Sequence, residues 1–159
     1  MRPNIVALAL VSLTAATISF AQAQSQDARV GTWKVNIAKS KYDPGPAPKA
    51  ETRTYKAYGN GGVSVTMEVT AADGKTSTRS YAMNFDGKDY PYKGNPDADM
   101  ISGKRVDPLT VETTNKRGGK VVTTSRGVVS KDGKTLTVTT TGTNAKGQKM
   151  HNVVVLDKQ

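Results

Sequence analysis

The sequence contains no cysteine and only one histidine, His151. Without cysteine the chain forms no disulfide, so its stability must come from burial and hydrogen bonding alone. The usual protein sites for zinc and copper draw on several cysteine or histidine side chains. We therefore expect no metal and no other cofactor, and we interpret His151 as a surface or packing residue.

Aromatic residues are also scarce, at 6% of the chain, whereas the formal net charge is +10. Proteins that bind single-stranded nucleic acids combine basic grooves with aromatic side chains on which bases stack. Here lysine and arginine are scattered singly, so we expect no nucleic-acid partner. A solvated surface whose charges repel one another and favour solubility explains the basic composition. Attraction to anionic envelope surfaces is the alternative.

Residues that could perform catalysis are few and are not grouped. Glu51, Glu68 and Glu112 fall in different predicted strands, so no two of them form the acid and base pair of a glycosidase. Asp97 and Asp99 follow a turn proline, and we interpret them as turn formers rather than calcium ligands. The sequence predicts no catalytic residue and a non-enzymatic protein.

A long apolar run occurs only near the N-terminus, over residues 5–20. Arg2 precedes this run, serines and threonines interrupt it, and Ala21-Gln22-Ala23 follows with the small-x-small pattern that signal peptidase cleaves. A membrane span needs about 20 predominantly apolar residues. We therefore predict a signal peptide over residues 1–23 with cleavage near Ala23, and a single mature domain, residues 24–159, that does not span a membrane and resides in the periplasm or outside the cell.

Turn signals recur along the mature chain at nearly even spacing. They include Asn60-Gly61-Gly62, Asp73-Gly74, Asp86-Gly87, Arg117-Gly118-Gly119 and Asp132-Gly133. Asn-Gly and Asp-Gly pairs supply the positive φ angles that tight hairpins require. Each interval holds one strand and a turn, but no crossover helix.

Between the turns, apolar residues recur with a period of two. Val63, Val65, Met67 and Val69 alternate with polar residues, which is the pattern of a half-buried strand. Successive hairpins predict an all-β fold, an antiparallel up-and-down meander closed into a lipocalin-like barrel of about eight to ten strands. A β-sandwich is the alternative, and its long connection would have to be residues 37–49.

Two further segments bear on the shape of this barrel. The last predicted strand, residues 149–157, is expected beside the first, residues 30–36, as the closing pair. Pro44, Pro46 and Pro48 favour an extended backbone over residues 37–49. We interpret that stretch as a linker over one barrel end, or as a flap beside a ligand entrance.

Three arginines occur within strand patterns and are the strongest candidates for a binding site. Arg126 shares its parity with Val122 and Val128, and Arg105 and Arg79 also fall on apolar rows. An arginine that points into a barrel needs a carboxylate, an aromatic ring or an anionic ligand. A bulge that turns each arginine to solvent and a structural role against Trp33 are the alternatives. The other candidate ligand-binding residues are Tyr81, Met67 and Met83.

The motif Gly31-Thr32-Trp33 opens the first predicted strand, as the Gly-x-Trp motif of lipocalins and fatty-acid-binding proteins does. The blocks Lys39-Ser40-Lys41, Phe85 to Pro91, Gly94-Asn95-Pro96, Lys104 to Asp107 and Ser130 to Thr137 also match a group of proteins. On these blocks the chain resembles small exported bacterial proteins of the calycin type, which have no assigned function. Trp33 is the only tryptophan and shares its parity with Gly31 and Val35, so we predict structural roles for Gly31 and Trp33, with Trp33 buried at the closed end of the barrel.

Two functions fit these observations. The first is an exported, non-enzymatic protein that binds a small amphipathic or anionic molecule inside its barrel. The alternative is an envelope-associated protein whose basic surface contacts anionic polymers or lipids. A cavity in the barrel would favour the first, and a filled interior with a clustered basic face the second. We expect a monomer in either case.

Overall fold

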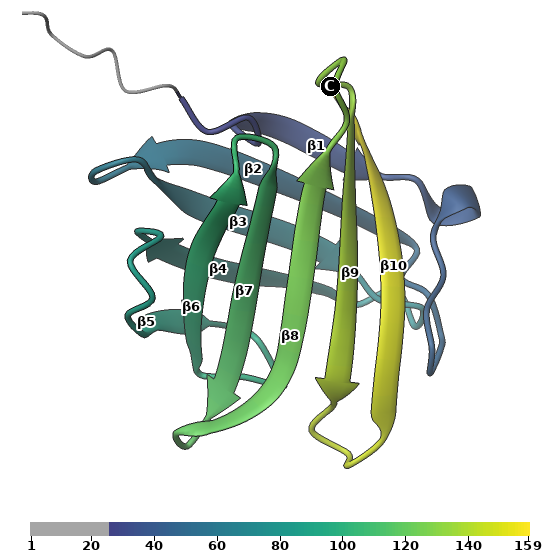
Figure 1. Cartoon of the computed structure of the whole chain (residues 1–159). Helices are drawn as coiled ribbons and strands as arrows, with labels where there is room; N and C mark the ends of the chain where they lie inside the picture. Colours follow the sequence, from purple (N-terminus) through teal and green to yellow (C-terminus); the bar gives the residue numbers. More distant parts are fainter. Residues whose placement is uncertain (1–25) are drawn as a thin grey trace, which may run out of the picture.

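In the computed structural model, which describes residues 26–159, ten antiparallel strands close into a barrel (Figure 1). In chain order the elements are β1 (Gly31–Val35), the 3-10 helix η1 (Ile37–Lys39), β2 (Ala50–Tyr58), β3 (Gly62–Thr70), β4 (Thr76–Met83), β5 (Tyr90–Lys93), β6 (Met100–Asp107), β7 (Thr110–Arg117), β8 (Lys120–Val129), β9 (Thr135–Thr143) and β10 (Lys149–Lys158). The predicted signal peptide lies outside the described residues.

Each strand pairs with its neighbours in sequence, and β1 pairs with β10 to close the barrel. The closing register places Val35 opposite Leu156 and Trp33 opposite Lys158. The predicted meander, the barrel and its closing pair are therefore confirmed, and the sandwich alternative is wrong. Closure pairs the edges that an open sheet would expose.

Strand β1 is short, and the chain after it continues to pair with β10. The backbone N–H of Lys41 donates to the carbonyl of Val153 (2.7 Å), and Val153 returns the bond to Lys41 (2.8 Å). The Ser40 hydroxyl accepts a hydrogen bond from the backbone N–H of Val155 (3.0 Å). These bonds hold the start of the irregular segment against the barrel wall.

The alternation in β3 shows how the sequence builds the wall. Val63, Val65, Met67 and Val69 are buried, whereas Thr66 and Glu68 between them are exposed. The turn to β4 uses Gly74 at φ +90°, a conformation in which a Cβ atom would be strained. Inward-pointing residues of period two thus meet inside the barrel.

The core fills one end of the barrel, the end where β1 begins and β10 ends. Its fully buried side chains are Trp33, Val63, Val65, Met83, Val129, Leu136 and Leu156. Gly103 packs closely against one of these side chains, that of Met83. A Cβ atom added at Gly103 would lie only 2.8 Å from Cε of Met83. This end is packed solid, and we call it the closed end.

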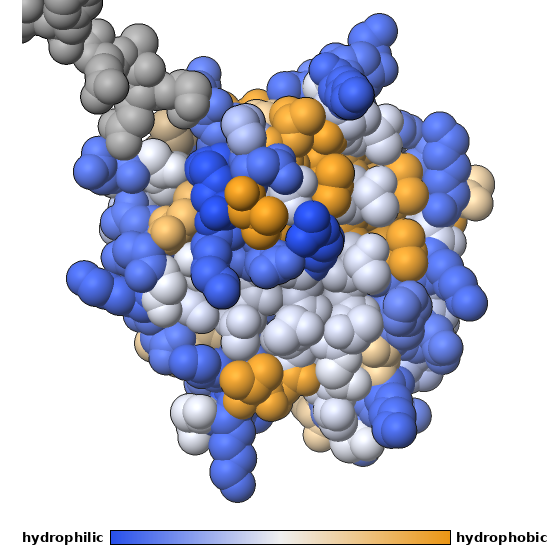
Figure 2. All heavy atoms as spheres, viewed as in Figure 1, coloured by the Kyte–Doolittle hydropathy of each residue, from blue (hydrophilic) through white to orange (hydrophobic). Residues whose placement is uncertain are grey.

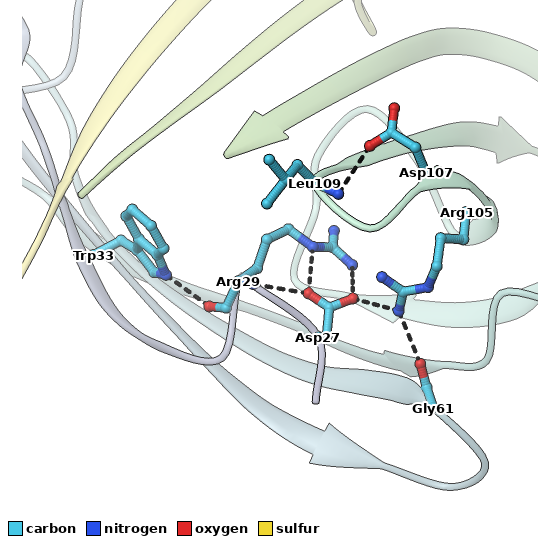
Figure 3. A network of polar contacts seen from close by, with 7 residues as sticks. All are labelled: Asp27, Arg29, Trp33, Gly61, Arg105, Asp107 and Leu109. Carbon is cyan, nitrogen blue, oxygen red and sulfur yellow. Dashed lines mark hydrogen bonds and ion pairs between the residues drawn. The ribbon is translucent and has the colours of Figure 1, made fainter. Parts of the chain in front are cut away.

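Residues that precede β1 seal the closed end with a buried ionic network (Figure 3). The Asp27 carboxylate accepts hydrogen bonds from the backbone N (2.9 Å), Nε (3.0 Å) and Nη2 (3.1 Å) of Arg29, and from Nη2 of Arg105 (2.6 Å). The Arg29 and Arg105 guanidinium groups both lie over the Phe85 ring, 4.9 and 4.7 Å from its centroid. Burial alone would lower the pKa of Arg29, but its hydrogen bond to Asp27 and the charge of that carboxylate raise it.

Trp33 links this network to the barrel wall. Its indole Nε1 donates to the carbonyl of Arg29 (2.7 Å), and the residue has no exposed surface. Lys158 places Nζ 5.2 Å from the indole centroid. Gly31 has φ +133° and lies against the Lys158 side chain, because a Cβ there would be 3.0 Å from Cε of Lys158. The predicted burial of Trp33 at the closed end is therefore confirmed.

Candidate functional site: a polar cavity in the barrel

The other half of the barrel contains a cavity of about 380 Å³. It lies between the closed-end core and the opposite, open end, where the segment after β1 and the β3–β4, β5–β6, β7–β8 and β9–β10 loops meet. Pro44, Pro46 and Pro48 line its mouth. The proline-rich segment thus lies beside the entrance, as the flap interpretation requires. A cavity of this size is within the range of small-molecule sites.

One wall of the cavity, from β2 to β5, carries charged and aromatic side chains. Glu51, Arg53 and Tyr55 alternate along β2 and all line the cavity. The Arg53 Nε lies 2.5 Å from Oε1 of Glu51. Burial alone would lower the pKa of Arg53, but the charge of Glu51 and the hydrogen bonds to Glu51 and Tyr55 raise it. Arg53 and Glu51 therefore form an internal ion pair.

Two tyrosines form the aromatic part of the same wall. The Tyr81 and Tyr92 rings meet edge to face, with centroids 5.0 Å apart and an interplanar angle of 75°. The Tyr92 hydroxyl donates to Sδ of Met67 (3.7 Å), a weak acceptor. Burial raises the pKa of Tyr92 to about 12, although the charges of Arg53 and Arg79 act in the opposite direction. The phenols are therefore neutral hydrogen-bond donors at ordinary pH.

The opposite wall, from β7 to β10, combines hydroxyl and amide groups with aliphatic side chains. Its polar members are Thr113, Asn115, Thr123, Ser125, Thr140 and Asn152. The Asn115 Nδ2 donates to Oγ1 of Thr123 (2.9 Å), which leaves the other polar atom of this amide for further bonding. The cavity thus has a cationic aromatic wall that faces a wall of neutral polar groups.

Three buried polar atoms lack a hydrogen-bond partner within residues 26–159, and all three belong to side chains that line this cavity. They are the Tyr42 hydroxyl, Nε of Arg79 and Oδ1 of Asn115. Buried polar groups are nearly always hydrogen-bonded in folded proteins, to protein or to another molecule. The cavity therefore presents polar atoms that a molecule inside it would satisfy.

Hydrogen bonds between loops order the open end on the side of β5 to β10. Oδ1 of Asp97 accepts from the backbone N of Ala145 (2.7 Å), which joins the β5–β6 loop to the β9–β10 loop. Arg117 donates to the carbonyls of Asp97 and Pro96, and Oδ2 of Asp99 accepts from the backbone N of Gly118 (3.0 Å). Asp97 and Asp99 thus serve as loop formers, as their turn context predicts.

The structure contradicts the predicted orientation of Arg126. Thr123, Ser125 and Gly127 line the cavity, so Arg126 lies on the outer face of β8. There its Nη1 lies 2.7 Å from Oε1 of Glu112, and half of its side chain is exposed. The prediction took the valine row as inward, but the cavity wall is polar at this strand and the inward row is Thr, Ser and Gly.

Arg105 and Met83, which the sequence also suggested as ligand-binding residues, do not line the cavity. Arg105 lies near a register shift in the β6–β7 pairing and binds Asp27 and the carbonyl of Gly61 (3.1 Å) at the closed end. Met83 has no exposed surface and packs in the core under Gly103. Both residues stabilise the closed end, where the interior is filled.

Arg79, Tyr81 and Met67 do line the cavity. Sequence reasoning missed other members of its wall, chiefly Glu51, Arg53, Tyr92 and Asn115. Strand β2 is polar on both rows, so its parity carried no signal for which row points inward. Asn115 lies in a strand of threonines and charged residues, in which the sequence again does not indicate which row points inward.

No protein-family model matches the chain, and a search of curated proteins finds no relative. The barrel is consistent with a calycin-like fold, which hosts many unrelated functions. Within residues 26–159, no three potential metal-binding side chains of the histidine, cysteine and carboxylate types gather in one place. No helix in the same part of the chain is long and apolar enough to cross a membrane.

Proposed function

We propose that this protein is an exported, non-enzymatic binding protein that holds a small organic anion inside its barrel. The observation that carries the proposal is Arg79, whose Nε is buried at the cavity and has no partner among the described residues. A guanidinium group keeps its charge and forms two parallel hydrogen bonds with a carboxylate. Export rests on the N-terminal apolar run and Ala21-Gln22-Ala23.

The pairing of charges around the cavity supports an anionic ligand. Three arginines line it, of which Arg29 is paired with Asp27 and Arg53 with Glu51. No ion pair to Arg79 occurs within residues 26–159. Arg79 therefore has no carboxylate partner among the described residues, and an anion in the cavity complements its charge.

Basic residues around the mouth favour the same class of ligand. The exposed ones in the loops and strand ends at the open end are Lys41, Lys49, Lys75, Lys93, Arg117, Lys120, Lys146 and Lys149. They outnumber the aspartates of the same loops. A cleft rimmed by charges of one sign raises the local concentration of oppositely charged ligands and their association rate.

Replacing Arg79 with glutamine should weaken the binding of a small carboxylate such as octanoate by about tenfold or more, because a charged hydrogen bond is lost. Isothermal titration calorimetry at low salt measures this change. Arg126→Gln is the matched control, since it removes an arginine from the outer face of the barrel. Equal affinities for both variants would contradict the role of Arg79, provided circular dichroism shows both to be folded.

The envelope-contact alternative finds less support. It requires a filled interior and a clustered basic face, whereas the barrel contains a cavity. Figure 2 shows a pale area over β7–β9, with hydrophilic residues at the margins and in the upper part of this face. Native mass spectrometry of protein purified from its own host would separate the two functions, because only the binding protein is expected to retain a small molecule.

A further inference from the structure

We infer that the ligand is a compact aromatic acid with a hydroxyl or similar polar group at its far end, and not a long-chain fatty acid. This inference rests on the proposed function and specifies its ligand class. Three properties of the cavity carry it, namely its size, the chemistry of its two walls, and the positions of its unpartnered polar atoms.

The volume restricts the size of the ligand. A cavity of about 380 Å³ lies toward the lower end of the range of small-molecule sites. A single-ring acid with a short side chain fits a site of this size. The tail of a long-chain fatty acid has no route past the closed end, where Trp33, Leu136 and Leu156 are fully buried, so it would have to extend toward the open end.

The wall from β2 to β5 matches an aromatic acid. Arg79 provides the positive charge for a carboxylate, and the aromatic side chains of Tyr55, Tyr81 and Tyr92 line the same wall. Aromatic rings prefer offset or edge-to-face contacts with other rings, a geometry that Tyr81 and Tyr92 already show. A planar ring next to the carboxylate fits this wall.

The wall from β7 to β10 disfavours a purely apolar tail. Oδ1 of Asn115 is buried without a partner among the described residues, next to the bond from its Nδ2 to Thr123. An aliphatic chain against this amide would leave it both dehydrated and unbonded, which is unfavourable. A ligand hydroxyl can donate or accept, so it satisfies the free polar atom of Asn115. A site that bonds a ligand hydroxyl discriminates strongly against analogues that lack it.

The test compares three acids by isothermal titration calorimetry on the purified protein: para-hydroxycinnamate, cinnamate and palmitate. We expect para-hydroxycinnamate to bind about tenfold or more tightly than cinnamate, and palmitate to bind most weakly. Asn115→Leu should reduce the advantage of the hydroxyl to less than about threefold. Thr114→Val, on the outer face of the same strand, is the control and should preserve it.

Different outcomes separate this inference from the proposed function. Arg79-dependent binding of palmitate, tighter than that of both aromatic acids, would overturn the inference and leave the proposed function standing. A hydroxyl preference that persists in a folded Asn115→Leu variant would overturn the assignment of Asn115. If none of the three acids nor octanoate binds, both the inference and the proposed function fail.

Discussion

Replacing Asp27 with asparagine is expected to lower the free energy of unfolding by about 3–5 kcal/mol, the usual effect of removing one partner from a buried ion pair. Asp27 is only 7% exposed, and its carboxylate is the common acceptor for Arg29 and Arg105. Asparagine is neutral, so the buried Arg29 would keep its charge without a counterion. The closed end would then hold two guanidinium groups against the Phe85 ring with no carboxylate between them.

Urea unfolding followed by circular dichroism measures this loss. Asp73→Asn is the matched control, because Asp73 lies 3.5 Å from Lys75 in an exposed ion pair, where the change should stay below about 1 kcal/mol. A loss for Asp27→Asn no larger than that of the control would mean that the network at the closed end contributes no more than a surface pair.

The same residue predicts how stability depends on pH. Burial alone would raise the pKa of Asp27, but the hydrogen bonds and charge of Arg29 outweigh it, so the pKa lies below its ordinary value of 3.8. The stabilisation by Asp27 is therefore fully present above the pKa of the unfolded chain, about 3.9, and is lost as the pH falls through the lower pKa of the folded state. The stability difference between wild type and Asp27→Asn should shrink below about pH 4. A constant difference between pH 7 and pH 2 would contradict this assignment.

Where the barrel is filled, the alternation of apolar and polar residues predicts which side chains of a strand point inward. In β3 one row is Val, Val, Met and Val, so only one parity can face an apolar core. In β8 the rule gives the opposite of the observed orientation, because the inward row of Thr123, Ser125 and Gly127 faces a polar cavity. Hydrophobic patterning identifies the inner face only where the interior is apolar. A polar cavity is where this premise fails.

The closed-end network could not have been predicted for a different reason. Asp27 and Arg105 are 78 residues apart, and their contact depends on how the segment before β1 folds over the barrel end. Local patterns contain no information about such a contact. The Gly-x-Trp motif did locate Trp33 correctly, because Gly31 and Trp33 lie at fixed positions at the start of β1, where the indole reaches Arg29.

Replacing Trp33 with alanine should also reduce the free energy of unfolding by about 3–5 kcal/mol, the usual cost of removing a large buried aromatic side chain. The indole has no exposed surface and is surrounded by the closed-end core, so its loss leaves a cavity that the rigid strands cannot fill. It also removes the bond from Nε1 to the Arg29 carbonyl. Tyr58→Ala is the control, because Tyr58 is 42% exposed, and its effect should be far smaller. Chemical unfolding monitored by circular dichroism gives both values, and a Trp33→Ala effect no greater than the control would contradict the packing role.

Combining Trp33→Ala with Asp27→Asn should lower the free energy of unfolding by less than the sum of the two single effects. Both residues hold Arg29, Trp33 through its carbonyl and Asp27 through its guanidinium and backbone N–H. Once either side chain is lost, Arg29 can leave its buried position. The second substitution then lowers the free energy of unfolding by a smaller amount. Residues that share a partner usually show interaction energies of about 0.5–3 kcal/mol in double-mutant cycles. Strict additivity would mean that the ion pair and the indole stabilise the closed end independently, and that Arg29 does not couple them.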